Sequence, residues 1–222
     1  MQKFDTPAPI TAVLDVPAGQ VRFIAADRAD TTVEVRPVDA SKSRDVKAAE
    51  QTTVEYGDGV LRVTVQPAKN QYLGASGSVE VTVQLPTGSR VEAKTAAAEI
   101  RGVGRLGDVT LENAQGPIKL DEAASAQLTV QSGDITLGRL TGPAEISTAK
   151  GDIRITEATS GAVVLRTQAG DISIDAARGT SASLDAGTAY GRIHNALRNG
   201  DGTATLTIHA TTAHGDITAR SL

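Results

Sequence analysis

The sequence lacks cysteine and tryptophan and has few aromatic residues of any kind. Its 222 residues include only two phenylalanines and three tyrosines. Without cysteine the chain can form no disulfide, offers no thiol nucleophile and cannot build a thiolate zinc site. Compact sandwiches draw much of their core volume from aromatic side chains. A core of Ile, Leu, Val and Ala therefore indicates a narrower and more regular β-architecture.

Long apolar runs and basic runs are also missing. No stretch of 18 uncharged apolar residues occurs, so no transmembrane helix and no membrane insertion are expected. Residues 1–16 contain no apolar segment long enough for a signal peptide. A net charge of −4 without any Lys/Arg run longer than two argues against nucleic acid as a partner. The expected location is cytoplasmic, or secreted or surface if a leader has been removed.

The first part of the chain, residues 1–88, alternates apolar and polar side chains as strands buried on one face do. The pattern predicts strands over 10–16, 20–25, 31–37, 52–56, 60–67 and 78–86. Residues 17–20 and 56–59 have the composition of turns. The charged segment 38–51 is predicted to hold a short helix or a mobile loop. Segment 68–77 is predicted to be a flexible loop, with Tyr72 and Leu73 as candidates for a packed flap.

From about residue 89 the sequence becomes a repeat. Gly, a variable residue and Ile begin each copy, at intervals of 17–24 residues, at Gly116, Gly133, Gly151, Gly170, Gly191 and Gly215. A weaker strand pattern precedes or lies between these copies, at 107–111, 126–130, 142–146, 161–165, 181–185 and 203–208. Units this short, with two strands each, fit the coils of a β-solenoid. Each strand should pair in parallel with its counterpart in the next coil, with right-handed winding.

One coil cannot fold alone, because its inward side chains do not offset the backbone entropy of ordering it. For one coil the inward residues are predicted to be Ile153, Ile155, Ala158, Val163 and Leu165. The predicted fold is therefore all-β. Residues 89–222 form a right-handed parallel β-solenoid of about six or seven coils, and residues 1–88 form a small β-rich unit that caps it.

Five aspartates follow a glycine at the start of a strand: Asp108, Asp134, Asp152, Asp171 and Asp216. A carboxylate at such a corner can accept hydrogen bonds from backbone amides that the corner leaves unpaired. The alternative is a column that binds calcium. Stacked carboxylates about 4.8 Å apart would repel by only about 1 kcal/mol per pair in water, so no metal is needed to hold them. The known calcium-solenoid signature is absent, and Pro117 and Arg192 replace Asp in two copies. The structural role is favoured; whether the column ever binds a cation is left open.

Other candidate chemistry is weaker. His194, His209 and His214, with Asp216 nearby in sequence, could hold a metal, but polar surface is the favoured interpretation. No nucleophile elbow is present. The outward columns concentrate neither carboxylates nor aromatics; they are predicted to be Lys119, Thr136, Arg154, Ser173, His194 on one face and Thr110, Thr129, Glu145, Val164, Ser183 on the other. No catalytic, cofactor-binding or metal-binding residue is assigned, and no cofactor is expected.

The alternation of Gly-Asp-Ile-x-Ile segments with Gly-x-Ala/Val-x-Ile/Leu segments, preceded by residues 79–100, resembles a bacterial β-strand-repeat family of unknown function labelled "putative adhesin". The likeness covers roughly residues 10–222. It implies a right-handed β-solenoid behind a β-rich N-terminal portion. The label implies attachment at a surface, and the family supplies no catalytic residues.

These observations predict a non-enzymatic binding or scaffold module with an unknown protein or glycan partner. One alternative is a self-assembling structural protein. Another is a carbohydrate-active enzyme with a site between the two halves. The last coil, ending in residues 215–222, shows no capping element, so self-association through this C-terminal edge of the solenoid is a further expectation.

Overall fold

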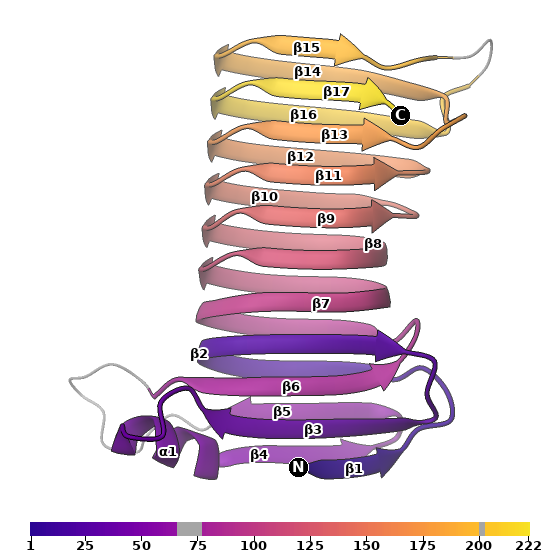
Figure 1. Cartoon of the computed structure of the whole chain (residues 1–222). Coiled ribbons are helices and arrows are strands. Elements are labelled where there is room, and N and C mark those ends of the chain that lie inside the picture. The colour runs from indigo at the N-terminus through magenta and orange to yellow at the C-terminus, as the bar shows by residue number, and fades with distance from the viewer. Residues whose placement is uncertain (66–76, 200–202) are drawn as a thin grey trace. The chain divides into compact units, whose positions relative to one another are not determined.

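The computed structural model describes residues 1–65, 77–199 and 203–222, and consists mostly of β-strands (Figure 1). The chain divides into two compact units, Met1–Gly116 and Pro117–Leu222. The repeat pattern led us to expect a division at residue 88. That boundary stays a prediction; β7 (Arg90–Gln115), which contains the first repeat-like residues, pairs over residues 90–103 with β2 (Thr11–Ala26) inside the first unit.

The first unit is a mixed sheet structure. Strand β2 is parallel to β5, β6 and β7, whereas β3 is antiparallel to β1 and β6, and β4 to β5. Its core includes Leu14, Phe23 and Leu61, all at most 2% exposed. The remaining elements are β1 (Gln2–Asp5), β3 (Asp30–Pro37), α1 (Ser43–Glu50), β4 (Thr52–Gly57), β5 (Val60–Val65) and β6 (Val79–Pro86).

Local expectations for this unit had mixed outcomes. The turn predicted at 56–59 is confirmed, since Asp58 and Gly59 adopt left-handed angles (φ 51° and 74°) between the antiparallel strands β4 and β5. Helix α1 confirms the helical alternative for 38–51. The turn predicted at 17–20 is wrong: β2 continues through it and only bends, with Gly19 (φ 130°) against the Val79 backbone. The flap suggested for Tyr72 and Leu73 lies outside the described residues.

The second unit contains only parallel pairings among its described strands. Its strands are β8 (Ile118–Ser132), β9 (Ile135–Leu140), β10 (Ala144–Lys150), β11 (Ile153–Ala158), β12 (Gly161–Ala169), β13 (Ile172–Ala176), β14 (Ala182–Tyr190), β15 (Ile193–Ala196), β16 (Leu206–His214) and β17 (Ile217–Ser221). We call each pair of consecutive strands from β10 onward, such as β12–β13, a repeat, and we count residues 126–140, the end of β8 together with β9, as the repeat before them.

Equivalent residues of neighbouring repeats lie opposite one another. Ile153 is paired with Ile135 on one side and with Ile172 on the other. The five residues predicted to point inward, Ile153, Ile155, Ala158, Val163 and Leu165, are at most 1% exposed, whereas Lys119 and Arg154 are exposed. The parallel pairing and the inward and outward assignment are confirmed.

The order of the repeats differs from their order in the sequence. Strands β16 and β17 pair with β12 and β13 on one side and with β14 and β15 on the other (Figure 1). The last repeat of the chain is therefore inserted between the two that precede it. The free edge that we expected at residues 215–222 is formed instead by β14–β15, which we call the edge repeat.

The side chains of Arg220 and Asn195 favour this order. Arg220 of β17 donates from Nε and Nη2 to the two carboxylate oxygens of the buried Asp175 on β13, both at 2.8 Å. The edge repeat has Ala196 opposite Arg220, and Asn195 at the next inward position, opposite the buried Ala219. If the edge repeat lay against β13, Asp175 would lose the guanidinium of Arg220, and the side-chain amide of Asn195 would be buried. At the edge, Asn195 is exposed.

The inward and outward assignment predicts a large loss of stability for aspartate at two inward positions and almost none at an outward one. Ile153→Asp, like Ile172→Asp, should cost at least about 3 kcal/mol and unfold the protein, since it leaves an unpaired charge in a dry interior. Thr136 lies opposite Lys119 and Arg154 at an outward position. Thr136→Asp should therefore change the free energy of unfolding by no more than about 0.5 kcal/mol. Urea unfolding followed by circular dichroism measures both. Similar losses for all three variants would contradict the assignment.

Candidate functional site

The aspartates at the corners of the second unit form a hydrogen-bonded ladder. Oδ1 of Asp134 accepts the backbone N–H of Asp152 at 2.9 Å, and Oδ1 of Asp152 accepts that of Asp171 at 2.8 Å. Oδ1 of Asp171 then accepts the N–H of Asp216 at 2.8 Å. Each carboxylate thus binds the backbone of the neighbouring repeat, as the structural interpretation of the sequence predicted. Asp108 belongs to the first unit.

Arg192 of the edge repeat ends the ladder. Its backbone N–H donates to Oδ1 of Asp216 at 2.8 Å, and its guanidinium donates to Oδ2 from Nη2 at 2.7 Å and from Nε at 3.2 Å. These side-chain hydrogen bonds, followed by the backbone one, lower the pKa of the Asp216 carboxyl. A lowered carboxyl pKa stabilises the fold above the ordinary pKa, and the contribution is lost as the pH falls through the lowered one.

A second ladder, of threonines, runs beside the first and was not predicted. The hydroxyls of Thr148, Thr167, Thr212 and Thr188 donate to the backbone oxygens of Gly133, Gly151, Gly170 and Gly215 at 3.0–3.4 Å. Gly151, Gly170 and Gly215 leave no room for a side chain: a Cβ on Gly170 would lie 2.0 Å from the oxygen of Gly151. The signal in the sequence is a Thr three residues before Gly in four copies, just upstream of the segment that begins with that Gly.

Beside the aspartate ladder an open groove of about 450 Å³ crosses β9, β11, β13 and β17. We call it the aspartate groove. The side chains that line it carry hydroxyl groups, carboxylates and one guanidinium, whereas the isoleucines among the lining residues are buried. The lining residues are Asp134, Ile135, Thr136, Asp152, Ile153, Arg154, Asp171, Ile172, Ser173, Asp216 and Thr218. No aromatic residue is among them. The groove offers hydrogen-bonding groups at the regular spacing of parallel strands, about 4.8 Å.

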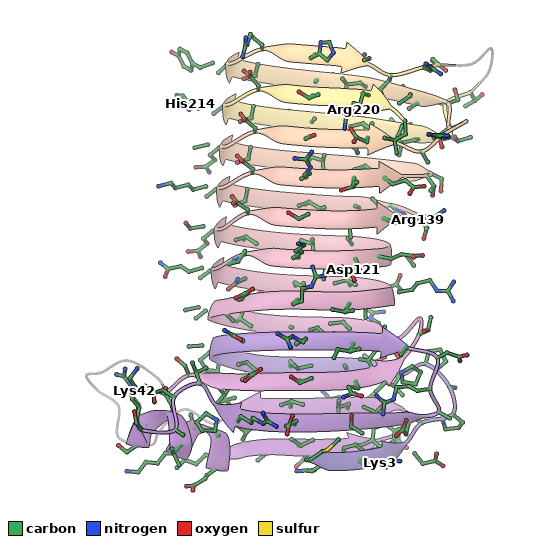
Figure 2. The ribbon with its side chains drawn as sticks, in the orientation of Figure 1. Lys3, Lys42, Asp121, Arg139, His214 and Arg220 are labelled. Atoms are coloured by element: carbon green, nitrogen blue, oxygen red, sulfur yellow. The ribbon has the colours of Figure 1, made fainter. Side chains whose placement is uncertain are left out.

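The three histidines have separate surroundings. Nδ1 of His209 lies 3.2 Å from Oδ2 of Asp185, and the ring of His214 stacks on Tyr190 with 5.0 Å between ring centroids. His194 is exposed on β15, opposite Thr218. Figure 2 shows His214 at the end of β16. It also shows Arg220, the partner of Asp175, on the next strand, β17. Within the described part of the chain, no three His, Cys, Asp or Glu side chains are grouped so as to hold a metal ion.

The ladder predicts that Asp152 matters as a hydrogen-bond acceptor. Asp152→Ala should lower the free energy of unfolding by about 0.5–1.5 kcal/mol, because the Asp171 N–H loses its acceptor. Asp152→Asn, which keeps an oxygen in place, should lose less than half as much. The melting temperatures of the original protein and both variants, measured with and without millimolar calcium, test the structural role and the alternative that the column binds a cation. A melting temperature that rises with calcium in the original protein, but not in either variant, would contradict the structural role.

Comparison with known proteins places the fold. Solved structures with similar folds include a "putative adhesin" from Parabacteroides distasonis ATCC 8503, with 14% identity and a TM-score of 0.51 over 98% of this chain and 95% of that one. Another is a "putative adhesin" from Bacteroides fragilis NCTC 9343, with 11% identity and a TM-score of 0.45 over 98% and 95% of the two chains. At 14% identity, the likeness to the Parabacteroides structure shows the fold alone.

No curated protein is detectably similar in sequence. Among the described residues, no helix is long and apolar enough to cross a membrane. The family resemblance seen in the repeats is confirmed by a match to a family model that covers nearly the whole chain. Because residues 12–221 match the model of the Toastrack DUF4097 family, the chain belongs to that family.

Proposed function

We propose that the chain is a non-enzymatic binding or scaffold module, built on a right-handed β-solenoid of six or seven coils, whose aspartate groove receives an extended protein or glycan partner. The observation that carries the proposal is the groove itself. It is open, lies across several repeats and presents a row of polar groups.

The chemistry of the groove favours binding over catalysis. Its ladder carboxylates are occupied by backbone N–H groups of the next repeat. Asp216, whose pKa is lowered, is held in its ionised form and is unsuited to act as a general acid near neutral pH. Catalytic sites instead bring together groups whose pKa values are shifted toward their task. The similar solved structure from Parabacteroides distasonis is labelled "putative adhesin", which supports the same choice over a carbohydrate-active enzyme.

The groove favours extended ligands, because its polar groups recur at equivalent positions of parallel strands. Thr136, Arg154 and Ser173 occupy equivalent positions on β9, β11 and β13, and lie opposite one another. A partner with polar groups along an extended chain can therefore form similar hydrogen bonds with successive repeats. The cytoplasmic location, and the capping of the repeats by the N-terminal portion, stay predictions.

Charge reversal at the single cation of the groove tests the proposal. Arg154→Glu should weaken partner binding at least tenfold, since a charged hydrogen-bonding group is worth about 1.5–3 kcal/mol. Arg166→Glu makes the same change on β12, outside the groove lining, where Arg166 pairs with Glu145 at 2.7 Å. Labelled protein is applied to polysaccharide and protein arrays, and reducing ends are assayed in parallel.

The matched control decides the location of the site. Equal binding by the two arginine variants would contradict a role for the groove. Release of reducing ends from a bound polysaccharide would contradict a non-enzymatic function.

A further inference from the structure

The edge repeat is paired on one side only. Within the described residues, β14 pairs with β16 and β15 pairs with β17, and neither has a second strand partner. The repeat β12–β13, in contrast, has neighbours on both sides, at β10–β11 and at β16–β17. One row of backbone hydrogen-bonding groups is thus directed away from the second unit along both β14 and β15.

The aliphatic lining of the unit is open at this edge. Ile193 lies opposite Ile217, which is fully buried, yet Ile193 is 46% exposed. Leu184 lies opposite the buried Ile208 and is itself partly exposed. Tyr190, at the end of β14, is 72% exposed. Residues at inward positions are covered elsewhere in the unit by the next repeat, so the edge repeat has an apolar surface that only another chain or segment can cover.

The charges of the edge do not oppose a contact with an identical surface. Residues 182–199 contain no lysine and no proline, the residues that commonly protect sheet edges. The guanidinium of Arg192 is paired with the Asp216 carboxylate of the neighbouring repeat. The remaining charges are Asp185 on β14 and Arg198 after β15, one of each sign. A contact between two copies can therefore place opposite charges together, which an edge with a single sign of charge could not do.

The ladder distinguishes two ways of covering the edge. In every ladder step, an aspartate accepts the N–H of the repeat added beyond it. At the edge that position is Arg192, which has no acceptor for a further parallel repeat. Pro117 lacks this carboxylate too, yet Ile118 and Ile135 beyond it pair in parallel, so a further parallel repeat would only forgo one hydrogen bond. An antiparallel approach needs no such acceptor, because its hydrogen bonds follow a different pattern.

We infer that a second copy of this chain covers the edge repeat, head to head and related by a twofold axis, with β14 and β15 paired antiparallel to strands of the partner. Isologous contacts of this kind close after two copies, so a dimer forms and not a filament. The inference does not depend on the aspartate groove being a binding site. It selects a discrete dimer over the self-assembling polymer considered from the sequence.

The dimer should be weak. Nine residues of β14 span about 30 Å, and two facing sheets lie about 10 Å apart. With the flanking side chains, each copy would bury on the order of 500 Å², below the roughly 800 Å² per partner of a standard stable interface. Association should therefore depend on concentration over the micromolar range and above.

Sedimentation of the full chain, from low micromolar to near-millimolar concentration, tests the dimer. The average mass should rise toward twice that of the monomer and no further. Ile193→Lys and Tyr190→Lys should each weaken association at least tenfold. Val38→Lys is the matched control, since Val38 is an aliphatic residue with 49% exposure in the first unit, and it should associate like the original protein. Thermal unfolding verifies that all variants fold.

Each other outcome overturns the inference. Monomers at every concentration would show that no copy covers the edge. Masses that grow beyond the dimer would indicate a head-to-tail polymer. Undiminished association of the two edge variants, or equal loss in Val38→Lys, would place the contact elsewhere on the chain.

Discussion

Parallel backbone pairing between neighbouring repeats is the interaction on which the second unit depends. In a single repeat, the backbone hydrogen-bonding groups of both strands would be unpaired and the inward aliphatic side chains would be exposed to solvent. Neighbouring repeats pair the backbone groups and bury the side chains. The pairing is useful only in one register, because a shift by one residue would turn every inward side chain outward. The aspartate and threonine ladders hold that register at the corners, where Asp152 and Thr167 each bind the backbone of an adjacent repeat.

This use of the ladders limits what the surface can do chemically. Carboxylates in a row would in other settings indicate a metal site or an acid-base pair, but here their Oδ1 atoms accept backbone N–H bonds along the stack. The groups left for a partner are hydroxyls, the outer carboxylate oxygens and Arg154, repeated at the strand spacing. Under our proposal, an extended ligand would be recognised through many modest contacts at these repeated positions.

Most of the local structure was predictable because periodicity reports burial directly. Alternation of apolar residues assigned the strands and the inward positions such as Ile153 and Val163, and the recurring Gly-Asp pair indicated a corner that binds backbone amides. The bend at 17–20 was mistaken for a turn because proline and glycine mark both features, and only the pairing of β2 with β7 distinguishes them. The aspartate groove could not be predicted, since it depends on which outward columns lie beside the ladder.

The order of the repeats shows where periodicity stops being informative. Either of the last two repeats presents an acceptable aliphatic face and parallel edge to β12–β13, so the pattern that predicts stacking cannot rank them. The ranking comes from departures from the pattern: Arg220 pairs with the buried Asp175, whereas the edge repeat has Ala196 and Asn195 at the corresponding positions. The residues that fit the repeat worst are therefore the ones that determine its topology. They place Arg192, Ile193 and Asn195 at an exposed edge, because a position between two repeats would leave an amide buried and a carboxylate without its partner.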